Sequence, residues 1–245
     1  RWTLTGEQGV LATLQDVPKR YNVDPNRVLL TGMSDGGNGT LIVGMQHADR
    51  FAGIAPIAAS FGELLFDFLE NFFNTPVYVL HGSKDEVMPV RYARAMVERL
   101  KALSYDVTYV EHDEVHPQAG AHFFPESQMP AMAEWMDQRV RAPLPKTITY
   151  FRDKPHLGRF YWSQITKPGK IATISYETVN EGMKQHLYAH FKATITGNRI
   201  DVSTVDVDFF KLKVTDENLP SVLVPNLSIT TSGAELCVFV KCLTG

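Results

Sequence analysis

The chain has 245 residues, of which 44% are hydrophobic and 21% charged, and its formal net charge is −3. This length and apolar content support one large or two modest domains whose cores need no disulfide bonds. The near-balance of charge gives no electrostatic reason to expect a nucleic acid or an anionic membrane surface as partner. No apolar stretch reaches the roughly 20 residues of a membrane-spanning helix, so we expect no membrane span.

The first part of the chain, residues 1–143, is predicted to alternate helices and strands. The expected helices cover residues 6–20, 37–47, 90–103 and 126–141, and the expected strands cover 28–31, 53–57, 77–81 and 107–111. Such alternation is typical of a parallel sheet covered by helices. The first domain is therefore predicted to belong to the α/β class.

The turn between the first expected strand and the second expected helix carries the sequence TGMSDGG, residues 31–37. A tight turn that exposes a nucleophilic hydroxyl strains the backbone of its central residue and leaves little room for nearby side chains. Gly32 and Gly36 are predicted to provide this room, and Ser34 is predicted to be the nucleophile. The N-terminus of the following helix favours negative charge, so the backbone N–H of Asp35 is expected to stabilise an oxyanion.

A nucleophilic serine needs a histidine base that is itself oriented by a carboxylate. The polar loop after the third expected strand carries Asp85, which we predict to be this acid, with its neighbour Glu86 as the alternative. The loop after the fourth strand carries three histidines. We predict that His122 is the base, because small residues precede it and a helix begins soon after it, and His116 is the alternative.

An unusually aromatic segment, residues 61–73, follows the second expected strand. We expect it to form an amphipathic helix that packs on the core, and the alternative is an apolar wall of an acyl or aryl pocket. In that second interpretation Phe61, together with Met33 beside the serine, contacts the substrate.

No metal or cofactor site is predicted. His186 and His190 are four residues apart, but the surrounding sequence is typical of a strand. Four residues of extended chain span roughly 13 Å, which is too far for two side chains to share one ion comfortably.

The quoted serine, aspartate and histidine motifs resemble the α/β-hydrolase superfamily. The similar branch contains carboxylesterase/phospholipase-like and polyhydroxybutyrate-depolymerase-like or feruloyl-esterase-like enzymes. The resemblance depends on TGMSDGG, on HGSKD at residues 81–85 and on GAH at residues 120–122. It covers about residues 1–143.

This resemblance implies a serine hydrolase that cleaves carboxylic esters through an acyl-enzyme, with a small or polymeric ester as substrate. Ser34 would attack the ester carbonyl, His122 would accept and return the proton, and Asp85 would hold the imidazole. The alternatives are a non-catalytic binding or assembly fragment and a peptidase on the same scaffold.

The chain also departs from this family. Only 33 residues precede Ser34, whereas the family has several strands and helices before the nucleophile, including the loop that completes the oxyanion hole. We therefore expect the chain to be the C-terminal part of a longer hydrolase. The exposed edge of the first strand would need cover from an N-terminal chain, a second copy of this chain or the helix of residues 6–20.

A linker with two prolines, residues 141–145, is predicted to separate the first domain from residues 147–245. Beyond it lie short segments rich in β-branched and aromatic residues, which predict a smaller antiparallel, β-sandwich-like domain of about seven or eight strands. The expected strands are 147–151, 159–162, 171–175, 188–196, 200–203, 207–213, 221–224 and 236–240. The aromatic residues at 160–162 are expected to pack inside this domain, and stacking on sugar rings is the alternative.

Overall fold

The computed structural model describes residues 2, 5–60, 62–154, 158–174 and 179–213, and the backbone of residues 228–232. The chain divides into two compact units, residues 1–142 and 143–245. No helix in the described part of the chain is long and apolar enough to cross a lipid bilayer.

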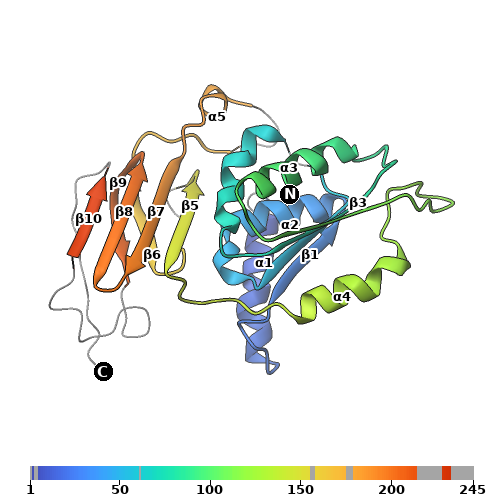
Figure 1. The fold of residues 1–245 in the computed structure, drawn as a ribbon, viewed down its shortest axis with the longest axis horizontal. Coiled ribbons are helices and arrows are strands. Elements are labelled where there is room, and N and C mark those ends of the chain that lie inside the picture. Colours follow the sequence, from blue (N-terminus) through green and yellow to red (C-terminus); the bar gives the residue numbers. More distant parts are fainter. Residues whose placement is uncertain are drawn as a thin grey trace. The chain divides into compact units, whose positions relative to one another are not determined.

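The first unit is built on a parallel sheet with the strand order β1-β2-β3-β4 (Figure 1). Its strands are β1 (Leu29–Met33), β2 (Gly53–Ile57), β3 (Val77–Gly82) and β4 (Val107–His112). Because all four run in the same direction, the loops that follow them lie at one edge of the sheet. The predicted α/β fold class is confirmed.

The helices of this unit lie between the strands in sequence. They are α1 (Thr5–Asp16), η1 (Val17–Lys19), α2 (Asp35–Gln46), η2 (Ala48–Arg50), η3 (Glu63–Phe72), α3 (Val90–Ala102), η4 (Glu126–Gln128) and α4 (Met129–Asp137). The aromatic segment therefore forms a 3-10 helix, η3, rather than an α-helix. Its Phe68 and Phe72 are buried, so this part of the segment belongs to the core.

Both faces of the sheet carry helices. On one face Met132 and Trp135 of α4 belong to an apolar cluster with residues of β2, of β3 and of the position that follows β2, namely Ala55, Ile57, Tyr78, Leu80 and Ala58. Ile54 has the opposite parity on β2 and points to the other face. There it lies against Gly44 of α2, which also approaches Phe72 of η3. This packing fixes the strand ends and the loops that they carry.

Strand β1 forms one edge of the sheet and, within the described residues, pairs only with β2. Its residues are half-buried or exposed, whereas β2 and β3 are buried throughout. Helix α1 contacts α2, and Oε1 of the buried Glu7 lies 2.8 Å from Nε2 of His47 at the end of α2. The expectation that an N-terminal chain or a second copy covers β1 stays a prediction.

A carboxylate on β4 ties this strand to α3. Glu111 accepts hydrogen bonds from Arg94 Nη2 at 2.5 Å and Arg94 Nε at 2.9 Å, and a third from the hydroxyl of Tyr109 at 2.5 Å. The hydrogen bonds from Arg94 are the main cause that lowers the pKa of Glu111 to about 2, from an ordinary 4.5. Because the folded state lowers this pKa, the contribution of Glu111 to stability is present above pH 4.5 and is lost as the pH falls toward 2.

Replacing Glu111 with Gln is therefore expected to lower the urea midpoint of unfolding at pH 7. The difference from the unmodified protein should shrink steadily between about pH 4.5 and pH 2. Glu98→Gln, at an exposed position of α3, is the matched control and should leave the midpoint unchanged. A difference for Glu111→Gln that is constant with pH would contradict this electrostatic account.

The second unit contains a sheet of order β10-β8-β7-β5 and a two-stranded sheet, β6-β9. Its elements are β5 (Thr147–Arg152), β6 (Ser163–Pro168), α5 (Glu181–Lys184), β7 (Ala189–Thr196), β8 (Arg199–Val205), β9 (Val207–Leu212) and β10 (Ser228–Ser232). All pairs are antiparallel except β10 with β8, which is parallel. The smaller, largely antiparallel β region predicted after the α/β core is confirmed.

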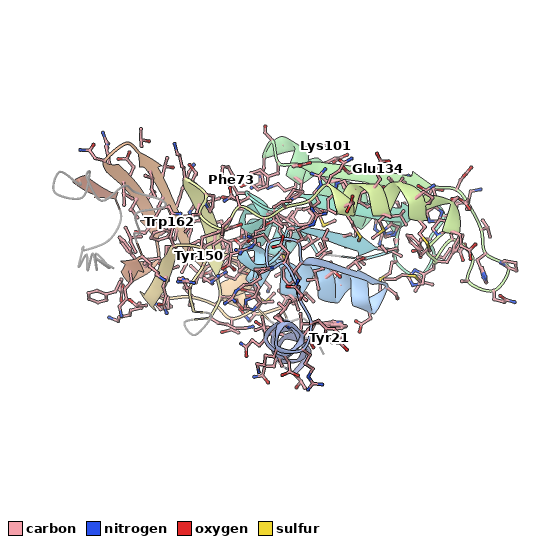
Figure 2. All side chains as sticks on the ribbon, turned by 90° about the horizontal axis from the view of Figure 1, so that it is seen from below. Tyr21, Phe73, Lys101, Glu134, Tyr150 and Trp162 are labelled. Carbon is pink, nitrogen blue, oxygen red and sulfur yellow. The ribbon has the colours of Figure 1, made fainter. Side chains whose placement is uncertain are left out.

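Within the described residues, the strands of this unit differ from expectation in two places. Residues 160–162 form a turn before β6, with Tyr161 at φ +50°, and residues 171–174 form no strand. The segments expected at 221–224 and 236–240 lie outside the described residues. Tyr150 and Trp162 are buried within the unit (Figure 2), and Trp162 Nε1 donates to Pro145 O at 2.7 Å. These aromatic side chains therefore pack inside the unit.

Candidate active site

Ser34 lies at the turn from β1 into α2, with φ 59° and ψ −121°. The backbone of a non-glycine residue at positive φ is strained, and such strain persists only where the surrounding structure imposes it. Here the backbone N–H of Ser34 donates to Ile57 O at 3.0 Å, at the end of the neighbouring strand. The turn thus holds the serine hydroxyl at the loop edge of the sheet, as a strand-turn-helix nucleophile motif requires.

The close approach of α2 to the sheet requires glycine at two positions. Only one of these, Gly32, was expected from the sequence. A Cβ on Gly32 would lie 2.4 Å from Gly36 O, and a Cβ on Gly37 would lie 2.5 Å from Ile57 O. A Cβ on Gly36 would meet nothing within 4 Å. The expectation for Gly32 agrees with the structure, whereas the steric argument for Gly36 is wrong and applies to its neighbour Gly37.

Three side chains from three different loops meet at this edge. His122 Nε2 is 2.8 Å from Ser34 Oγ, and His122 Nδ1 is 2.8 Å from Asp85 Oδ2. Because the carboxylate accepts, Nδ1–H donates to it, and this leaves Nε2 as the acceptor for the serine hydroxyl. The arrangement has the geometry of a nucleophile, a base and an orienting acid.

The carboxylate of Asp85 is fixed by its own loop. Its Oδ1 accepts from the backbone N–H groups of Val87 at 2.9 Å and Met88 at 2.8 Å, and its side chain is fully buried. Gly82, at the end of β3, also lies against the histidine loop, since a Cβ there would be 2.2 Å from Ala121 O. The end of β3, from which the acid loop (residues 83–89) starts, is thus packed directly against the histidine loop, which carries Ala121 and His122.

The alternative acid and bases lie elsewhere. Glu86 is exposed. His116 is exposed and begins a short hairpin closed by backbone hydrogen bonds to Gly120. His112 is buried at the end of β4, where its ring lies edge-on to Phe123 at 5.4 Å. Among His112, His116 and His122, it is His122 that is hydrogen-bonded to Ser34 and Asp85.

The backbone N–H of Asp35 is the first of α2, so it has no acceptor within the helix. It lies next to Ser34 at the positive end of the helix dipole, where an oxyanion is stabilised. The Asp35 carboxylate accepts from Trp2 Nε1 at 3.1 Å, a contact that the sequence did not suggest. Met33 is 37% exposed beside the serine, and Phe61 lies outside the described residues.

His81 was missed as a contributor to this site. Its side chain is fully buried, and its Nε2 lies 2.6 Å from Met88 O and 3.5 Å from Asp85 Oδ2. Burial lowers the pKa of His81 below the ordinary histidine value. The only signal in the sequence was its place four residues before Asp85, at the end of a buried strand.

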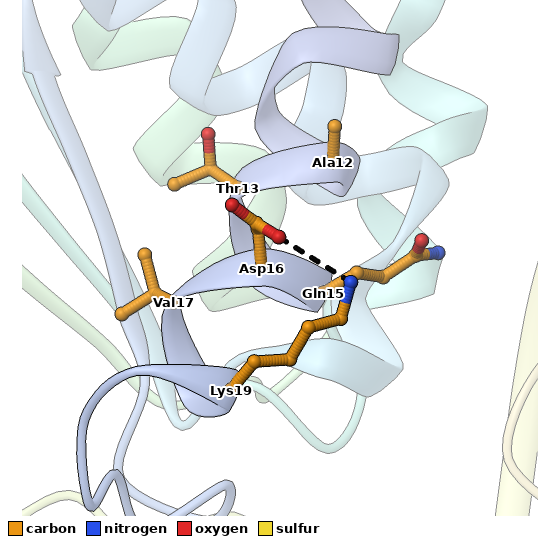
Figure 3. A pocket seen from close by; sticks show the side chains of 6 residues that line it. All are labelled: Ala12, Thr13, Gln15, Asp16, Val17 and Lys19. Atoms are coloured by element: carbon orange, nitrogen blue, oxygen red, sulfur yellow. Dashed lines mark hydrogen bonds and ion pairs between the residues drawn. The ribbon is translucent and has the colours of Figure 1, made fainter.

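A pocket of about 390 Å³ lies along α1 and η1 (Figure 3). It is lined by Ala12, Thr13, Gln15, Asp16, Val17 and Lys19. None of these belongs to the serine, histidine and aspartate cluster. In the described part of the chain, no group of three or more His, Cys, Asp or Glu side chains is arranged to hold a metal ion.

Comparison with known proteins gives relatives that are similar in sequence to part of this chain. Over 91 residues the chain is 30% identical to acyl-protein thioesterase 1 of Gibberella zeae, which covers 35% of this chain and 38% of that protein. Over 90 residues it is 31% identical to the bifunctional acetylxylan esterase/xylanase XynS20E of Neocallimastix patriciarum, covering 36% of this chain and 13% of that protein. The chain thus spans less than two fifths of the length of either relative.

Among solved structures, a thermostable esterase is similar over 55% of this chain and 36% of its own, with a TM-score of 0.48 and 25% identity. SOBER1 of Arabidopsis thaliana is similar over 56% of this chain and 63% of its own, with a TM-score of 0.44 and 21% identity. The decisive match is to a family: residues 8–139, more than half of the chain, fit the phospholipase/carboxylesterase family, and the protein therefore belongs to this family of α/β-hydrolases.

Proposed function

We propose that the protein is a serine hydrolase that cleaves carboxylic esters through an acyl-enzyme, with Ser34, His122 and Asp85 as its catalytic triad. One observation carries the proposal: Ser34 Oγ and Asp85 Oδ2 each lie 2.8 Å from opposite nitrogens of the same imidazole. A serine hydroxyl in ordinary surroundings is a poor nucleophile, and this contact supplies the base that it needs.

The first half of the reaction follows from the tautomer of His122. Ser34 Oγ attacks the ester carbonyl carbon while His122 Nε2 accepts the hydroxyl proton, and the C=O electron pair moves to oxygen. The backbone N–H of Asp35 stabilises this oxyanion. When the C–O bond to the leaving group breaks, the imidazolium returns the proton to the departing alkoxide, so an alcohol leaves and Ser34 stays acylated.

A water molecule then carries out the second half of the reaction by the same steps. It attacks the acyl-serine carbonyl, gives its proton to His122 Nε2 and forms a second oxyanion beside Asp35. Collapse of this intermediate breaks the bond to Ser34 Oγ, which takes the proton back, and the carboxylic acid leaves. Throughout, Asp85 accepts from Nδ1–H and stabilises the imidazolium without taking the proton itself.

The acyl group is the part of the substrate that this mechanism requires. The names of the two relatives, an acyl-protein thioesterase and an acetylxylan esterase, both denote hydrolysis of an acyl group from a sulfur or oxygen leaving atom. The acyl group that both names share supports acyl transfer to Ser34. We propose carboxylic esters as the substrate class.

A fluorophosphonate probe tests the proposal directly, because it reacts with activated serines. We expect one adduct per chain, mapped by peptide mass spectrometry to Ser34, and hydrolysis of p-nitrophenyl acetate that stops when the adduct forms. The same chain unfolded in guanidinium should take up no probe, since the histidine is then no longer near the serine. A folded chain that is not labelled, or is labelled at another residue, would overturn the proposal and favour a non-catalytic binding fragment.

A further inference from the structure

His81 is the penultimate residue of β3, and the acid loop, residues 83–89, follows the end of this strand. Its strand neighbour in the sheet register is Glu111 of β4, so its backbone is held within the parallel ladder. Its imidazole is fully buried, with Nε2 2.6 Å from Met88 O. The ring therefore joins the rigid end of a central strand to the far end of the acid loop.

This contact fixes the tautomer of His81. A carbonyl oxygen only accepts, so Nε2 must carry the proton that it donates to Met88 O. The other nitrogen, Nδ1, is buried and has no hydrogen-bond partner within the described residues. A second proton on Nδ1 would place a charged N–H where nothing accepts from it, and this disfavours the cation.

The hydrogen bond acts on Asp85 through Met88. The N–H of Met88 donates to Asp85 Oδ1, while the carbonyl of the same residue accepts from His81. Asp85 Oδ2, the oxygen that His122 contacts, lies 3.5 Å from His81 Nε2. His81 thus determines where the loop presents both carboxylate oxygens relative to β3.

The charged and titratable groups around His81 come from three elements. Asp85 lies on the acid loop, His122 on the histidine loop, and His112 and Glu111 on β4. A cationic His81 would form an ion pair with Asp85 and compete with His122 for the same carboxylate. A neutral His81 supplies an N–H dipole without this competition.

We propose that His81 is a positioning residue for Asp85: as a neutral Nε2–H imidazole, it holds the acid loop through Met88 and leaves the Asp85 carboxylate free to orient His122. The inference depends on the proposed function for its effect on rate, although the geometry that it assigns to the carboxylate does not.

Two substitutions by amide side chains distinguish the effect of the hydrogen bond to Met88 O from the effect of having a polar side chain at position 81. In His81→Gln the amide nitrogen reaches the place of Nε2 and still donates to Met88 O. In His81→Asn the same amide stops near the place of Nδ1 and does not reach the carbonyl. His112→Asn is the matched control, since it also replaces a buried imidazole, on the next strand, whose two ring nitrogens have no hydrogen-bond partner within the described residues.

We expect His81→Asn to lower kcat by about 10- to 100-fold with little change in KM, because a displaced acid misorients the base. His81→Gln should recover most of kcat, and His112→Asn should retain it. We expect a strongly downfield NMR signal from His122 Nδ1–H, which would report its hydrogen bond to Asp85. This signal should persist in His81→Gln and shift upfield in His81→Asn. Equal kcat and an unchanged NMR signal in all folded variants would overturn the proposal.

The unmodified protein provides a test that does not depend on how the variants fold. Long-range nitrogen NMR of the imidazoles should show His81 as the neutral Nε2–H tautomer at pH 7. A neutral Nδ1–H tautomer, or a cation, would overturn the proposal. If probe labelling misses Ser34 while these NMR results hold, the proposed function fails and the positioning of Asp85 by His81 stands.

Discussion

Replacing Asp85 with Asn is expected to slow fluorophosphonate labelling of Ser34 by a factor of about 10⁴. The reason lies in the two oxygens of Asp85. Oδ1 accepts from two backbone N–H groups, so the oxygen of an asparagine will stay there and its NH₂ group will replace Oδ2. A donor then faces His122 Nδ1, which must become an acceptor, and the proton moves to Nε2. A protonated Nε2 cannot accept the proton of Ser34.

The rate constant for labelling measures this effect without requiring turnover. Glu86→Gln is the matched control, because it makes the same change of carboxylate to amide at the exposed neighbouring position and should leave the rate unchanged. Circular dichroism should show both variants folded. A labelling rate for Asp85→Asn close to that of the unmodified chain would exclude Asp85 as the orienting acid, and a large loss for Glu86→Gln would revive the alternative.

Much of this cluster was accessible to sequence reasoning because each member follows a strand. Parallel strands place their carboxyl ends at one edge, so Ser34, Asp85 and His122 were expected to be neighbours although up to 88 residues separate them. The choice of His122 over His116 also depended on local sequence, since small residues precede His122 and a helix begins soon after it, whereas a proline follows His116.

Other features depend on contacts that no local pattern encodes. Gly37 must be small because α2 approaches the carbonyl of Ile57 on another strand, whereas the sequence motif drew attention to Gly36. Burial of His81 follows from strands packed on both sides of β3. The aromatic run at 160–162 has strong strand propensity, yet tertiary packing buries Trp162 at the end of a turn, where its Nε1 finds a carbonyl.

Replacing Gly32 with Ala is expected to reduce the labelling rate of Ser34 by about 100-fold or more and to lower the free energy of unfolding by about 1–3 kcal/mol. The new Cβ would lie 2.4 Å from Gly36 O and 2.6 Å from Gly36 C, which are backbone atoms of the first turn of α2. This turn must therefore move away from β1. Ser34 lies between the two, so its hydroxyl leaves the 2.8 Å contact with His122.

Gly36→Ala is the control because it adds the same methyl group four residues later, in the first turn of α2. Nothing lies within 4 Å of that position, and alanine favours a helix over glycine by up to about 1 kcal/mol. This variant should label at the normal rate and unfold at an equal or higher urea concentration. If Gly32→Ala labels normally, or if both substitutions impair labelling equally, then close approach of α2 to β1 does not set the position of the serine.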